Sequence, residues 1–183
     1  MRLLKELWRC EGLKRGGRTE QREAVRAVVL REGRKLLLIY SGVNGDFKFP
    51  GGGMETGETR EETLRRELLE ESGAVLNGVL GALGKVVEYD LPQKNREYDL
   101  FCMISYYYLC RISPELGETR LDPYERRLEF GPVWVDVAEA IDTNQARLAR
   151  PAPPFWTKRE TCVLQLLQAQ LPGEDSEYSR PAA

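Results

Sequence analysis

Histidine is absent from this 183-residue chain. Without an imidazole the chain cannot build a serine–histidine type of nucleophile, and the usual zinc sites that depend on histidine are excluded as well. Any general base must then be a carboxylate, a lysine, a tyrosine or a metal-bound hydroxide. Enzyme classes that depend on histidine are therefore removed before any motif is considered.

Paired cysteines and long apolar runs are also missing. The four cysteines (Cys10, Cys102, Cys110 and Cys162) are widely spaced and form no C-x-x-C pair, which is typical of free thiols in a reducing compartment. Charged residues interrupt the first ten positions, so these lack the apolar core of a signal peptide, and no apolar run is long enough to span a bilayer. We expect a cytoplasmic protein with no membrane partner.

An excess of charge of one sign is lacking too, because 27 basic and 29 acidic residues leave a formal net charge of −2. No overall basic field would collect nucleic acid or an anionic membrane, so a small-molecule partner is favoured over RNA or DNA. The hydrophobic content of 42% and charged content of 31% are typical of a soluble globular protein. The length suits one domain, and a homodimer is left open.

The most informative stretch of the chain is residues 52–74, GGMETGETREETLRRELLEESGA. Thr59 followed three residues later by Glu62 is a capping-box signature, in which each side chain satisfies a free backbone N–H at a helix start. The spacing predicts a helix over residues 60–72, with Gly73 as its left-handed C-terminal stop.

Three glutamates gather on one face of this predicted helix. Glu67, Glu70 and Glu71 follow the i, i+3, i+4 spacing, and Leu64 and Leu68 lie on the flank of the same face. Like charges at this spacing destabilise a helix, and partial burial makes their repulsion worse unless a cation is present. Hard divalent metals such as Mg²⁺ take oxygen ligands and suit this arrangement. On spacing alone, a solvated glutamate-rich helix is equally acceptable.

The same stretch resembles the Nudix box, G-x5-E-x7-R-E-U-x-E-E-x-G-U, where U is a bulky apolar residue. The pattern is met by Gly52, Glu58, Arg66, Glu67, Leu68, Glu70, Glu71 and Gly73. Only the last position departs, because it holds Ala74, and we interpret this as a packing change since no ligand comes from there. The resemblance implies an α/β/α sandwich with a mixed β-sheet. It also implies a metal-dependent hydrolase that cleaves the diphosphate linkage of a nucleoside diphosphate joined to another group.

The resemblance further implies a metal site for Mg²⁺ or Mn²⁺. Its ligands would be Glu67, Glu70 and Glu71, with Glu58 and the Gly51 carbonyl as further oxygens. Such ions bridge phosphate oxygens and lower the pKa of a bound water, which eases attack on a negatively charged diphosphate.

Other residues around the box would position these groups or the substrate. By resemblance, Arg66 orients the glutamates, Gly73 ends the helix, and Gly52 and Gly53 let the backbone approach the metal–phosphate unit. Phe49, just before the glycines, is a candidate to stack on the nucleotide base. No spacing separates nucleotide-sugar, ADP-ribose-like, dinucleotide and nucleoside triphosphate substrates.

The sequence leaves the catalytic base open. Glu70 and Glu71 within the box are candidates, and so is Glu129, just before the last predicted strand, with Glu118 and Glu125 behind it. A loop glutamate is more often an exposed charge than a catalytic group. The alternatives to an enzyme are a Nudix-like sensor of nucleotide metabolites without turnover, which the intact box argues against, and a messenger-RNA decapping protein, which the acidic balance argues against.

The remaining pattern predicts one Nudix-like domain. We expect a short N-terminal extension over 1–22, the domain over 23–171, and a disordered tail over 172–183. The expected strands are 24–30, 35–40, 46–49, 81–90, 100–112 and 129–137, with a loop over 113–127. Capping patterns at Asp136 and at Thr157 predict two further helices.

Overall fold

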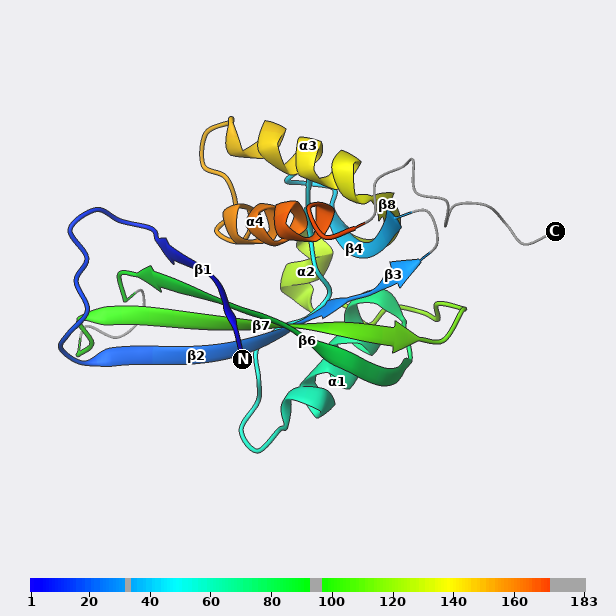
Figure 1. Cartoon of the computed structure of the whole chain (residues 1–183), viewed down its shortest axis with the longest axis horizontal. Coiled ribbons are helices and arrows are strands. Elements are labelled where there is room, and N and C mark those ends of the chain that lie inside the picture. Colours follow the sequence, from blue (N-terminus) through cyan, green and yellow to red (C-terminus); the bar gives the residue numbers. More distant parts are fainter. Residues whose placement is uncertain (32–33, 93–96, 172–183) are drawn as a thin grey trace.

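The structure of the chain is a computed structural model, and it describes residues 1–31, 34–92 and 97–171. In chain order the elements are β1 (Leu3–Trp8), β2 (Thr19–Val28), β3 (Leu30–Arg31), β4 (Lys35–Ser41), β5 (Asp46–Lys48), α1 (Arg60–Ser72), β6 (Leu76–Asp90), β7 (Leu100–Ile112), α2 (Pro123–Arg127), β8 (Phe130–Asp136), α3 (Val137–Leu148) and α4 (Thr157–Gln168). The strands lie between α1 on one side and α3 and α4 on the other (Figure 1). This confirms the expected α/β/α layers.

The strands form two sheets. The larger has the order β1-β6-β7-β2, in which β6 and β7 are antiparallel while β1 and β2 each run parallel to their neighbour. In the smaller sheet β4 pairs with β3, β5 and β8, each time antiparallel. The sheet is therefore mixed, as expected, and β7 is a central strand over the predicted range 100–112.

Helix α1 has the predicted bounds. Thr59 and Glu62 complete the capping box, and Gly73 is left-handed with φ of 67°. Leu64 and Leu68 are buried with Val25 and Ala27 of β2 in one apolar cluster. This packing fixes the glutamate-bearing helix against the larger sheet.

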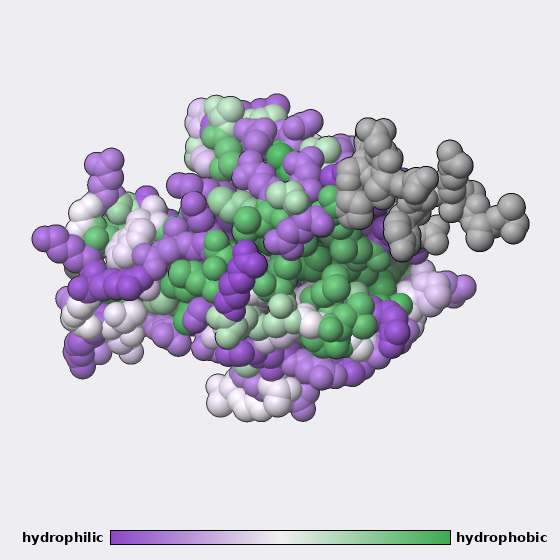
Figure 2. All heavy atoms as spheres, viewed as in Figure 1, coloured by the Kyte–Doolittle hydropathy of each residue, from purple (hydrophilic) through white to green (hydrophobic). Residues whose placement is uncertain are grey.

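The opposite face of the sheet carries a second apolar cluster beneath α4. Val163, Leu164 and Leu167 of that helix pack with Val28 and Phe49. In the orientation of Figure 1, apolar residues gather at the centre of the molecule between α4 and α1, and polar residues surround them (Figure 2). None of the helices in the described parts of the chain is long and apolar enough to cross a membrane.

Two strand starts were predicted too late. β2 starts at Thr19 instead of residue 24, and β6 starts at Leu76 instead of residue 81. The first residues of both strands are polar or include glycine, and they pair with β7 through backbone hydrogen bonds. A search for apolar residues does not reveal such pairing. The division into an extension of residues 1–22 and a domain from 23 stays a prediction, but β1 pairs with residues 85–89 of β6 and so belongs to the sheet.

Two predictions near the C-terminal half were wrong in detail. The expected loop over 113–127 contains α2, which begins with a capping box formed by Asp122 and Glu125. Thr157 does not cap α4, because its hydroxyl donates to Asp46 Oδ2 at 2.5 Å and the N-cap residue is Trp156. Asp136 caps α3 as expected, by accepting the Ala138 N–H. The predicted tail lies outside the described residues.

Gly73 permits a close approach of two backbone segments at the end of α1. The Gly117 N–H donates to the Gly73 carbonyl at 2.8 Å. A Cβ at residue 73 would lie 2.1 Å from the Gly117 carbonyl oxygen, a backbone atom that cannot rotate away. We expect Gly73→Ala to lower the free energy of unfolding by about 2–4 kcal/mol, because left-handed strain of about 1–3 kcal/mol adds to this clash.

Urea unfolding followed by circular dichroism measures this effect. Gly131→Ala is the matched control, since a Cβ there meets no atom within 4 Å. An equal, small loss in both variants would contradict the prediction.

Candidate active site

The glycine loop lies along the free edge of β2. Val25 N–H donates to the Gly52 carbonyl at 3.0 Å, and Ala27 N–H donates to the Pro50 carbonyl at 2.8 Å. Gly51 has φ of 138°, and a Cβ there would lie 2.1 Å from the Val25 carbonyl oxygen, so only glycine fits. The loop is thus fixed to the sheet edge like a short added strand.

Two glutamates of α1 reach this loop. A Cβ on Gly52 would lie 2.4 Å from Glu67 Oε1, so the carboxylate of Glu67 sits directly over that glycine. The Gly51 N–H donates to Glu71 Oε2 at 2.7 Å. The glycines therefore admit the α1 carboxylates close to the backbone.

Arg66 gathers the other glutamates. Its Nε and one terminal nitrogen bind the two oxygens of Glu58 at 2.7 and 2.8 Å, while the other terminal nitrogen lies 2.6 Å from Glu67 Oε1 and 3.4 Å from Glu70 Oε2. The terminal nitrogen that binds Glu58 also donates to the Gly53 carbonyl at 3.1 Å. The guanidinium of Arg66 holds the pKa of Glu58 at about 2. The structure thus supports an orienting role for Arg66, which nevertheless stays a prediction.

Glu71 is held by a different cation. Lys48 of β5 places its Nζ 2.5 Å from Glu71 Oε1, and the Glu71 side chain is 1% exposed. Burial raises the pKa of neighbouring Glu67, and the charge of Glu71 adds to the rise. Arg66 and Arg26 offset part of this rise. The repulsion expected from the glutamate spacing is therefore present and is relieved by basic side chains.

The donors near the loop are of the type that a divalent ion takes. All are oxygens, four carboxylates and the carbonyls of a glycine loop, and hard ions such as Mg²⁺ prefer such ligands. Within the described ranges, no three carboxylate or cysteine side chains converge closely enough to hold a metal as they stand. Arg66 and Lys48 contact oxygens of all four carboxylates. The residues fit the ion in type, and basic side chains hold several of their oxygens in this structure.

The loop glutamates lie at different places. Glu129 has φ of 53°, and its carboxylate packs over Gly42, since a Cβ there would lie 2.6 Å from Glu129 Oε2. Glu118 is exposed. Glu125 of α2 is half-buried, and burial together with the adjacent charge of Glu71 raises its pKa to about 7. The structure therefore brings Glu125, rather than Glu129 or Glu118, to the box.

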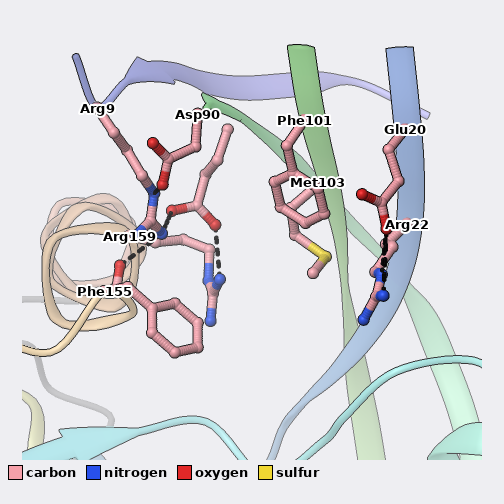
Figure 3. A pocket seen from close by; sticks show the side chains of 9 residues that line it. Arg9, Glu20, Arg22, Asp90, Phe101, Met103, Phe155 and Arg159 are labelled. Atoms are coloured by element: carbon pink, nitrogen blue, oxygen red, sulfur yellow. Dashed lines mark hydrogen bonds and ion pairs between the residues drawn. The ribbon is translucent and has the colours of Figure 1, made fainter. Parts of the chain in front are cut away.

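A groove of about 240 Å³ opens on the α4 face of the larger sheet. Figure 3 shows its two walls: Arg9, Asp90, Phe155 and Arg159 on one side, and Phe101, Met103, Glu20 and Arg22 from β7 and β2 on the other. Arg22 and Arg26 point to this same face of β2, because side chains alternate along a strand. Four residues along the strand separate Arg22 from Arg26 by about 13 Å, and the glycine loop runs beside the intervening residues, with Gly53 bridged to Ala24.

Buried charges connect the groove to the loop. Arg159 binds Glu88 and Glu160, each at 2.6 Å, and all three side chains are at most 3% exposed. Tyr107 donates its hydroxyl to Glu160 at 3.1 Å, and Arg26 lies 3.9 Å from the same carboxylate. Among the described residues, Arg26 Nε has no hydrogen-bond partner. A row of alternating charges thus leads from the groove to the residues beside Glu67.

Comparison with known proteins agrees with the motif and the fold. A family model described as the NUDIX domain matches residues 20–155. The chain belongs to the Nudix family. The matched range contains the glycine loop, the whole Nudix box and the three loop glutamates Glu118, Glu125 and Glu129.

Curated relatives of this Nudix chain match only part of it. The RNA pyrophosphohydrolase of Sulfurovum sp. (strain NBC37-1) is 35% identical over 85 residues, 45% of this chain and 54% of that protein. The RNA pyrophosphohydrolase of Helicobacter pylori (strain G27) is 39% identical over 59 residues, 32% of this chain and 37% of that protein. The match therefore spans about half the length of these relatives or less.

Solved structures similar to the Nudix chain show the same fold. The solution structure of the Escherichia coli ORF135 protein has a TM-score of 0.51 at 21% identity, over 85% of this chain and 96% of that one. The MutT structure from work on Aliivibrio salmonicida and Vibrio cholerae has a TM-score of 0.52 at 18% identity, over 83% and 100% of the two chains. At these identities the likeness concerns the fold.

One predicted substrate contact needs correction. Phe49 has no exposed surface, because it packs in the core with its ring edge-to-face on Tyr107 at 5.5 Å between centroids. It cannot stack on a base in this position. Gly52 and Gly53 remain accessible to different degrees, and their predicted contact with substrate stays a prediction.

Three residues near the Nudix box were missed or ranked too low: Lys48, Arg26 and Glu125. Lys48 lies in a short segment between two phenylalanines, where nothing distinguishes it from a surface lysine. Arg26 interrupts the apolar run AVRAVVL, and a charge at a buried strand position is a signal that could have been used. For Glu125, the spacing from Asp122 and the intervening Pro123 are the capping pattern already applied at Thr59.

Proposed function

We propose that this Nudix protein is a metal-dependent pyrophosphohydrolase that cleaves the diphosphate linkage of a nucleoside diphosphate derivative. The observation that carries this proposal is the placement of the box glutamates against a glycine loop that is itself fixed to β2. A carboxylate cluster against close backbone is what a metal–phosphate unit requires on its protein side.

The proposal assigns metal-binding and orienting roles to the residues of the box. Glu67, Glu70, Glu71 and Glu58, with the Gly51 carbonyl, would hold Mg²⁺ or Mn²⁺. When bound, the ion supplies charge neutralisation of the phosphate oxygens and a more acidic water. Arg66 would hold the carboxylates in place through its contacts with Glu58, Glu67 and Glu70.

The groove beside the loop supports a nucleotide-sized substrate. Phe101, Met103 and Phe155 offer apolar surface, and Arg9 and Arg22 offer guanidinium groups, which together suit a base and its sugar. In the proposed arrangement, a nucleoside would lie in the groove and its diphosphate would reach along β2 to the box. The curated relatives are named RNA pyrophosphohydrolases, so the 5′ end of an RNA joins the small nucleotides as a candidate substrate. Our expectation from charge that RNA is disfavoured stays a prediction.

A substrate panel tests the proposal. The purified protein is incubated with nucleotide-sugars, ADP-ribose, dinucleoside polyphosphates, nucleoside triphosphates and a 5′-triphosphorylated RNA oligonucleotide, with and without Mg²⁺ or Mn²⁺. We expect metal-dependent release of phosphate products from one class far above the others. Binding without cleavage across the panel would instead support the alternative, a nucleotide-metabolite sensor without turnover.

Contact with Glu71 favours Glu125 over Glu129 as the catalytic base. We expect Glu125→Gln to lower kcat by at least about tenfold, within the range of a lost general base, and Glu129→Gln to stay within about twofold of wild type. Steady-state kinetics of both variants at saturating metal measure this difference. A strong loss in Glu129→Gln with normal activity in Glu125→Gln would instead favour Glu129, one of the candidates from the sequence.

A further inference from the structure

Lys48 holds the most deeply buried carboxylate of the Nudix box. Its Nζ lies 2.5 Å from Glu71 Oε1, with the two side chains 12% and 1% exposed. The other oxygen, Oε2, accepts the Gly51 N–H at 2.7 Å. Both oxygens of Glu71 are therefore occupied by donors of the protein itself, in surroundings that screen charge poorly.

This arrangement differs from that of the other box glutamates. Glu58, Glu67 and Glu70 share the single guanidinium of Arg66, which lies at the partly exposed side of the cluster. Arg66 contacts four of the oxygens of these three carboxylates, so other oxygens of the cluster are not bound to it. A divalent ion can approach those oxygens while Arg66 stays in place, whereas at Glu71 it meets an ammonium already bound.

An ammonium and a divalent ion would repel each other strongly on one buried carboxylate. For a divalent ion to take Glu71, Lys48 must therefore give up its contact. Two groups can receive the released ammonium. Nζ already lies 4.6 Å from the ring centroid of Phe130, a cation–π contact, and Glu125 lies close enough for the charge of Lys48 to act on it.

We propose that Lys48 is a positioning residue that occupies Glu71 in the metal-free protein and exchanges with the divalent ion when the site is loaded. The ammonium keeps the buried carboxylate neutralised and correctly placed, and it lowers the affinity for metal because it must be displaced first. This inference rests on the proposed function in one respect, that Glu71 is a metal ligand.

Metal affinity provides the first test. Mn²⁺ binding to wild type, Lys48→Met and Lys35→Met is measured at pH 8 from the electron paramagnetic resonance signal of the free ion. We expect Lys48→Met to bind at least about tenfold more tightly than wild type, since close buried charge pairs couple at least this strongly. Lys35→Met, a control at an exposed strand position, should bind like wild type.

The same measurement on Glu71→Gln and on the double variant separates exchange at Glu71 from a general effect of charge. If Lys48 acts through Glu71, the Lys48→Met change should have little effect once Glu71 is Gln. An equal tightening with Gln at residue 71 would overturn the exchange. If wild type and all variants fail to bind Mn²⁺, the proposed function itself fails.

A second experiment uses the wild-type protein, so it does not depend on the folding of a variant. In metal-free wild type, a buried ammonium bound to a carboxylate should give a lysine side-chain ¹H–¹⁵N signal by nuclear magnetic resonance. We expect this signal to shift or disappear when Mg²⁺ saturates the protein. If the signal stays unchanged while backbone signals of α1 report bound Mg²⁺, Lys48 does not leave Glu71 and the proposal is wrong.

Discussion

Glu71→Gln should reduce metal-dependent turnover by a hundredfold or more while the protein remains folded. The substitution keeps the side chain's size and its acceptor for the Gly51 N–H, but it removes the charge that a divalent ion requires. Removing one charged or polar group that acts in the transition state commonly costs on the order of 10²–10³ in rate. Glu71 should be at the upper end, because it is the box glutamate with the least access to water.

The structure also predicts a side effect of this substitution. Lys48 loses its carboxylate partner at 2.5 Å, so the variant should be somewhat less stable than wild type. Kinetics must therefore be measured well below the melting temperature, and circular dichroism should confirm the fold. Glu61→Gln is the matched control, since that side chain of the same helix is 60% exposed and pairs with Arg65 at 3.5 Å on the surface. Turnover near wild type in Glu71→Gln would remove Glu71 from the metal site.

The parts of the site that could be predicted from the sequence are those set by local spacing. Helix α1 was predicted to the residue because Thr59, Glu62 and Gly73 act on backbone groups within one turn. The common face of the glutamates follows from helix geometry alone. Neither depends on how distant parts of the chain pack, so a single sequence is sufficient.

The parts that could not be predicted depend on contacts distant in the chain. Lys48 and Glu71 are 23 residues apart and meet only because β5 and α1 both adjoin the glycine loop. At residues 157–160 the local rule was misleading, because the Thr-x-x-Glu pattern there does not cap α4. Thr157 donates to Asp46, and Glu160 accepts the Tyr107 hydroxyl, so contacts with distant residues hold both side chains away from the helix cap.

The second large effect concerns stability rather than turnover. Arg159→Met should lower the free energy of unfolding by about 3–5 kcal/mol, because it leaves two buried carboxylates without their main counter-charge. Arg159 binds Glu88 and Glu160 at 2.6 Å each, and it is itself 1% exposed. A total stability of about 5–15 kcal/mol is usual for a domain, so this single change could remove a large part of it. Arg22→Met is the control, since Arg22 pairs with Glu20 at the surface and should cost little.

The pH dependence of this loss separates charge from packing. Burial pushes the pKa of Glu88 upward, but Arg159 and Arg9 outweigh burial, so the pKa lies below its usual value. In wild type this carboxylate therefore contributes stability that is present above its unfolded pKa of about 4.3 and is lost as pH falls through the lower folded value. In Arg159→Met the buried Glu88 carboxylate loses the larger of its two counter-charges, so burial favours its protonation and the gap in stability between the two proteins should narrow from pH 7 to pH 5. Urea unfolding at both pH values measures it, and a constant gap would mean that lost packing, not unpaired charge, causes the instability.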